Sequence, residues 1–130
     1  MIRRNVFACV LTVFAAIALT AQGRWEALGQ LNVTDRADHD TLTVTRAKGG
    51  YEAIKFEVRR RGVDFHRVVI HFANGDDQRV EMRNSIAAGG ESRVIDLEGR
   101  ERIIRSIEFW YDARSAGRGG PAMVRVVGRH

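Results

Sequence analysis

Apolar residues recur at every second position in most of the chain after residue 40. In residues 54–58, for example, Ile, Phe and Val alternate with Lys and Glu. The same period recurs at 42–44, 68–72, 80–82, 95–97, 107–111 and 122–126. Side chains of an extended chain alternate between two faces, so this period indicates strands with one buried face. The sequence therefore predicts an all-β fold, a single antiparallel, jelly-roll-like β-sandwich of about eight short strands, with a small barrel as the alternative closure.

The first 23 residues have a different pattern. Arg3 and Arg4 precede an uncharged apolar run at 6–19, and small residues follow at Ala21 and Gly23. A positive start, an apolar stretch of this length and a small-residue cleavage zone are typical of a secretory signal peptide. The run is short for a membrane-spanning helix, which needs about 20 residues. We therefore expect residues 1–23 to be a cleaved Sec-type signal peptide, cut near Gly23, and the mature protein to be periplasmic or secreted.

The remaining residues, 24–130, have the size of one domain, and we expect them to form a single β-sandwich. Cys9 lies in the apolar run and is the chain's one cysteine, so the mature domain has no thiol for disulfides, catalysis or zinc binding. Without Arg3 and Arg4, 19 Lys and Arg stand against 16 Asp and Glu, a net charge of +3. That excess is too small to indicate nucleic acid, and no transmembrane segment is expected in the mature chain.

The segment "HFANGDDQRV" predicts a β-hairpin. Asn-Gly favours a two-residue turn, but such a turn would place Arg79 on the same face as Ile70, because opposed residues share a face. An odd loop of three residues (74–76) or of five (73–77) pairs Ile70 with Val80 and Val68 with Met82, so that both apolar sets face one core. The sequence therefore predicts an odd loop, with Gly75 or a neighbouring Asp at positive φ.

Four segments resemble a family of small exported bacterial proteins built around a domain of unknown function, the YaaI-like type. These segments are "ALGQ", "IHFANGDDQ", "SRVIDLEGRERIIRSIEFWY" and "AMVRVVGR". The resemblance extends over most of residues 24–130. It implies export and a β-sandwich, and it brings no catalytic residues.

Catalytic motifs are missing from the sequence. It contains no Gly-x-Ser-x-Gly, no His-Glu-x-x-His and no Walker-type loop. The acid pairs Glu98 with Glu101 and Asp76 with Asp77 fit solvated turns better than a glycosidase pair. We therefore expect a binding protein without a cofactor, not an enzyme. A hydrolase of cell-envelope polymers and a purely structural envelope component are the alternatives.

The segment "VTDRADHDTL" raises the question of a metal site. Asp35, Asp38 and Asp40 are weak candidate ligands, because no glycine lies between them and no second histidine is near. A turn before the strand that holds Leu42 explains the same residues, so no metal is expected. His66 and His71 point to opposite faces of a strand unless a bulge near residues 64–65 intervenes. We expect His71 to be exposed and His66 to cap the edge of the core.

Two features suggest a binding surface. Arg59, Arg60 and Arg61 form a run at a strand end, and guanidinium groups favour carboxylate and phosphate. Trp110 alternates with buried residues and should face outward, where an aromatic ring can stack on a sugar or contact another chain. The candidate ligand-binding residues are therefore these four. The expected partner is an anionic glycan, a lipid headgroup or an envelope protein.

Overall fold

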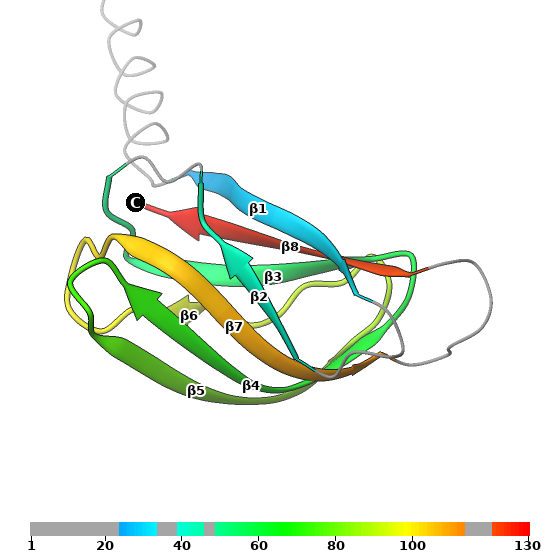
Figure 1. Ribbon diagram of the computed structural model, residues 1–130. Coiled ribbons are helices and arrows are strands. Elements are labelled where there is room, and N and C mark those ends of the chain that lie inside the picture. Colours follow the sequence, from blue (N-terminus) through cyan, green and yellow to red (C-terminus); the bar gives the residue numbers. More distant parts are fainter. Residues whose placement is uncertain (1–23, 34–38, 46–48, 114–120) are drawn as a thin grey trace, which may run out of the picture.

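The structure, a computed structural model, describes residues 24–33, 39–45, 49–113 and 121–130. These residues form two four-stranded antiparallel sheets (Figure 1). The first sheet has the order β1-β8-β3-β6 and the second has the order β2-β7-β4-β5. The strands are β1 (Trp25–Val33), β2 (His39–Thr43), β3 (Ala53–Arg59), β4 (Val63–Phe72), β5 (Asp77–Ile86), β6 (Ile95–Asp96), β7 (Ile104–Ala113) and β8 (Ala122–Arg129). Within this part of the chain, no helix has the length and apolar character needed to cross a bilayer.

The strand order is that of a jelly roll, as expected from the sequence. The pairs β1·β8, β2·β7, β3·β6 and β4·β5 are all antiparallel and are nested one inside the next. Such a chain is one long hairpin folded over into two packed sheets. The sheets keep open edges, so the molecule is a sandwich and not a closed barrel.

The core lies between the two sheets and includes most of the residues that the period-two pattern selected, together with others that it did not, such as Phe65. Phe56, Phe65 and Phe109 pack together there, with ring centroids 5.3–6.0 Å apart. Fully buried aliphatic residues from both sheets surround them, including Ile54, Val68, Ile70, Ile107 and Val126. Burial of apolar area at about 25 cal/mol per Å² is therefore what holds together a domain without disulfides.

The β4–β5 hairpin has the predicted odd loop with a different register. Phe72 N donates to Asp76 O and Gly75 N donates to Phe72 O, so three residues, 73–75, form the loop. Gly75 has φ +97°, as predicted. The prediction that Ile70 opposes Val80 is wrong, because Ile70 opposes Gln78 and Val68 opposes Val80. The register differs from the predicted one by two residues, so each side chain stays on its predicted face of the sheet and the same face is buried.

A bulge in β4 changes the position of His66. The register between β4 and both of its neighbours shifts between Phe65 and Arg67. The expectation that His66 caps the core is wrong, because the bulge turns the side chain outward. It is exposed, and its Nε2 lies 2.9 Å from Asp112 Oδ2.

Polar side chains close the sandwich beside β5, an edge strand. Gln78 points inward and is buried, with Nε2 donating to Asp96 O at 2.9 Å and Oε1 accepting from Glu98 N at 2.8 Å. The guanidinium of Arg93 donates to the backbone carbonyls of Glu81 and Met82, each at 3.1 Å. Both side chains fasten the segment around β6 to β5.

Candidate functional site

Trp110 lies on the outer face of the second sheet, as the alternation predicted. His39 on β2 stacks on the ring with centroids 4.5 Å apart and an interplanar angle of 21°. The guanidinium carbon of Arg67 on β4 lies 4.0 Å from the ring centroid. Because β2 and β4 flank β7 on opposite sides, these two groups cover opposite faces of the indole. The ring is therefore already stacked on both faces, which leaves no face for a sugar.

A chain of hydrogen bonds runs across the same outer face and joins all four strands of the second sheet. His39 Nε2 lies 2.8 Å from Glu108 Oε2, and His71 Nε2 lies 2.5 Å from Glu108 Oε1. His71 Nδ1 lies 2.6 Å from Asp77 Oδ1. We refer to His39, Glu108, His71 and Asp77 as the histidine chain. His71, expected to be exposed, points outward but is only 20% exposed because it lies between these acids.

The histidine chain shifts the titration of its central members. The hydrogen bond to Glu108 raises the pKa of His71 above its ordinary value of 6.5, against the smaller opposing effect of burial, and Asp77 adds to the rise. The same bond from His71, together with the bond from His39, lowers the pKa of Glu108 below 4.5. Carboxylate and imidazolium therefore stabilise each other's charged form.

Arg59, Arg60 and Arg61 form the tight connection between β3 and β4, which joins the two sheets. We call these three residues the arginine turn. Arg61 N donates to Arg59 O at 2.9 Å, and Arg60 at the centre has φ +73°. This is the strained form of the γ-turn, in a region that non-glycine residues rarely adopt. Arg59 and Arg60 are exposed and Arg61 is half-buried.

The arginine turn and Trp110 are not brought into one cluster. The ring partners of Trp110 among the described residues are His39 and Arg67. An open hollow of about 580 Å³ instead lies next to the arginine turn, lined by residues that include Gly62, Val63, Ser85 and Ala87. The two sequence candidates therefore belong to different parts of the surface.

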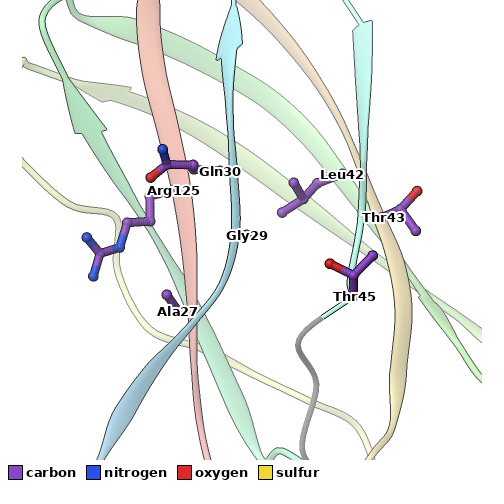
Figure 2. Close-up of a pocket in the computed structure, with 7 residues that line it drawn as sticks. All are labelled: Ala27, Gly29, Gln30, Leu42, Thr43, Thr45 and Arg125. Carbon is purple, nitrogen blue, oxygen red and sulfur yellow. The ribbon is translucent and has the colours of Figure 1, made fainter.

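A second hollow, of about 490 Å³, lies at the seam where β1 and β2 meet (Figure 2). Figure 2 shows Leu42 pointing from β2 toward Gly29 on β1, whereas Arg125 points away on the far side of β1. A Cβ on Gly29 would lie 3.1 Å from Leu42 Cδ1, so this glycine lets the leucine fill the seam. The polar side chains around this hollow diverge, and no ligand chemistry follows from them.

The metal candidates are divided between two parts of the chain. Asp35 and Asp38 lie outside the described residues. Asp40, which was expected in a turn, lies within β2, and its Oδ2 accepts a 2.6 Å hydrogen bond from the buried Tyr111 hydroxyl. Over the described ranges, no three His, Cys, Asp or Glu side chains are gathered closely enough to hold a metal ion.

Sequence reasoning missed the histidine chain as a unit. Its members come from positions 39, 71, 77 and 108, and they meet because of the strand order β2-β7-β4-β5. The one available signal was parity, which places His71 and Glu108 on outward faces. Which outward residues are neighbours depends on strand order and register, and neither follows from parity.

Comparison with known proteins gives a family and a distant structural likeness. A family model described as a domain of unknown function (DUF2541) matches residues 6–128. No curated protein matches the chain. Among solved structures, the crystal structure of SPBc2 prophage-derived protein YomS aligns with 83% of this chain and 93% of its own, at 10% identity and a TM-score of 0.42.

Proposed function

We propose that this chain, which belongs to the DUF2541 family of domains of unknown function, is an exported, non-catalytic jelly-roll module that binds an anionic partner through the arginine turn. The partner we propose is an envelope glycan carrying phosphate, sulfate or carboxylate groups. Export is proposed from the apolar run at 6–19 and its flanking residues, together with the likeness to the YaaI-like exported proteins.

The observation that supports this proposal is that three consecutive arginines have no ion pair among the described residues. Four other cations on the sandwich have carboxylate partners: Lys55–Glu91 at 3.2 Å, Arg102–Asp76 at 3.2 Å, Arg125–Glu57 at 3.5 Å and Arg129–Glu52 at 3.1 Å. Within the described part of the chain, no ion pair involves Arg59, Arg60 or Arg61. Three adjacent guanidinium groups without internal partners keep their donors for an external anion.

The strained backbone supports the same interpretation. Positive φ at a non-glycine residue costs about 1–3 kcal/mol and is retained when the surrounding structure requires it. Arg60 bears this strain at the tip of the connection, between two further arginines. A carboxylate or phosphate group can accept two parallel hydrogen bonds from one guanidinium, which makes such a tip selective for planar or tetrahedral anions.

The test compares two triple variants with the same loss of charge. We expect R59Q/R60Q/R61Q to elute from immobilised dextran sulfate at a clearly lower salt concentration than the wild type. The control R79Q/R83Q/R105Q removes three exposed arginines elsewhere and should elute close to the wild type. Neutral dextran should retain none of the three proteins.

An equal loss of retention in both triple variants would contradict the proposal, because net charge alone would then account for binding. Circular dichroism and melting temperature of each variant confirm that it is folded before retention is compared. Unchanged retention of R59Q/R60Q/R61Q would exclude the arginine turn directly.

A further inference from the structure

Both ring nitrogens of His71 face carboxylate oxygens. Nε2 lies 2.5 Å from Glu108 Oε1 and Nδ1 lies 2.6 Å from Asp77 Oδ1. A neutral imidazole has one N–H and one lone pair, so it donates at one nitrogen only. With ionised acids on both sides, the neutral ring would point its lone pair at an oxygen. Both hydrogen bonds therefore form only when the imidazole ring is doubly protonated.

His130, directly after β8, also has an acceptor at each ring nitrogen. Its Nδ1 lies 2.7 Å from the carbonyl oxygen of Gly50, and its Nε2 lies 2.7 Å from Glu26 Oε1. A carbonyl oxygen only accepts hydrogen bonds, and so does an ionised carboxylate. The ring also stacks on Tyr51 with centroids 4.4 Å apart, which fixes its orientation. His130 therefore donates at both nitrogens only when the ring is doubly protonated.

We infer that folding of this domain is coupled to the protonation of His71 and His130, two imidazolium locks, one on each sheet, that release as the pH rises. The lock at His71 ties β4 to β7 and β5, and the lock at His130 ties the end of β8 to β1 and to the segment before β3. The free energy of unfolding of the domain is then highest at mildly acidic pH.

The two locks lie near the same end of the sandwich. The C-terminus and the β4–β5 turn are at one end in Figure 1, and the β3–β4 connection is at the other. The locks therefore stand apart from the arginine turn, and the inference does not depend on the proposed function. His39 and His66 differ from the locks, because each has a carboxylate at one ring nitrogen and no described acceptor at the other.

The charged surroundings of each lock agree with this assignment. His71 faces Glu108 from β7 and Asp77 from β5, with Arg79 one outward position further along β5 and His39 on the other side of Glu108. The pKa of His130 is raised by the bonds to Gly50 and Glu26 and by the charges of Glu26 and Glu101, against a smaller effect of burial. Arg129 is the adjacent cation, and it is paired with Glu52.

The sign of the pH effect follows from the directions of these shifts. A raised histidine pKa gives stability that is fully present below the ordinary value of 6.5 and is lost as the pH rises through the folded-state pKa. The lowered pKa of Glu108 gives stability that is present above 4.5 and is lost as the pH falls through the folded-state pKa. The stabilising contributions of the two histidines and of Glu108 are therefore all fully present between pH 4.5 and pH 6.5.

The experiment measures the melting temperature of the wild type from about pH 6 to about pH 9, the range in which raised histidines lose their protons. We expect a progressive fall. H71Q and H130Q should each remove part of this pH dependence, and H71Q/H130Q most of it. The control H66Q, which changes an exposed histidine with one acceptor, should keep the wild-type slope.

A second measurement applies to the wild type and so does not depend on whether the variants fold. Nitrogen-15 NMR at about pH 6 should show both ring nitrogens of His71 and His130 protonated, and both residues should titrate above the ordinary histidine range. The inference is overturned if either ring is a neutral tautomer there. It is also overturned if the melting temperature of H71Q/H130Q falls with pH as steeply as that of the wild type.

Discussion

Trp110 illustrates how much of a residue's role parity alone can predict. The alternation of 107–111 placed it on the outer face, and it lies there. The closure of both ring faces was not predictable, because His39 and Arg67 come from strands that are distant in sequence and adjacent only in the sheet. The outward orientation is correct, and the contacts with His39 and Arg67 favour a structural role for the ring over an aromatic platform.

Replacing Trp110 by Ala should cost about 1–2 kcal/mol of unfolding free energy, because one stacking and one cation–π contact are lost. Retention on dextran sulfate should not change. The matched control is Phe109→Ala on the same strand, which removes a fully buried ring and should cost about 3–5 kcal/mol. Chemical denaturation of both variants gives the comparison. A cost for Trp110→Ala as large as that for Phe109→Ala would show that Trp110 is part of the core.

At the scale of the element, β5 shows how an exposed strand edge is blocked. An edge strand presents unpaired backbone groups on which other chains can pair. Arg93 occupies the carbonyls of Glu81 and Met82, in the middle of β5. The sequence predicted that β5 is a strand and which of its faces is buried. It did not predict the edge position, since strand order depends on the whole topology.

Arg93→Ala should therefore make the protein more prone to self-association, with a loss of about 1–3 kcal/mol from the two hydrogen bonds to a charged donor. Light scattering at increasing protein concentration measures the association. The control Arg79→Ala removes the same charge from the outer face of β5 and leaves its edge covered. Equal association of the two variants would show that charge matters here and not the covered edge.

The hairpin register shows why elements are predicted better than their pairing. Parity excluded the two-residue turn, and the three-residue loop confirms that exclusion. Parity does not distinguish registers that differ by two residues, because both keep the same face buried. In the observed register Gln78 opposes Ile70, and its side chain reaches the backbone of Asp96 and Glu98 from inside the sandwich. A buried glutamine with two distant backbone partners has no local signature.

For the whole molecule, the fold class followed from composition and period, and the histidine chain did not. The alternating segments predicted seven of the eight strands and much of the core, and no cysteine was needed to hold a domain of this length together. The locks at His71 and His130 depend on which strands become neighbours. The histidines and the acids can be read from the sequence, but their contacts cannot be predicted without the strand order.

Export is a prediction for the whole chain. The pattern of residues 1–23 leads us to expect a mature protein that begins at or near Arg24 in the periplasm or the medium. N-terminal sequencing after cell fractionation checks this expectation. Recovery of the protein from the cytoplasm with Met1 in place would contradict both export and the proposed envelope partner.

The nested strand order also determines when each sheet can form during synthesis. The pair β4·β5 closes over three residues, whereas Trp25 pairs with Arg129, 104 positions later (129 − 25). Long loops cost more entropy to close, and pairings of this kind slow folding. We expect the β4–β5 hairpin to form first and the outer pairs to follow. In the first sheet β8 lies between β1 and β3. This sheet therefore cannot assemble until β8 has been synthesised, and β1 stays unpaired while nearly all of the domain is made.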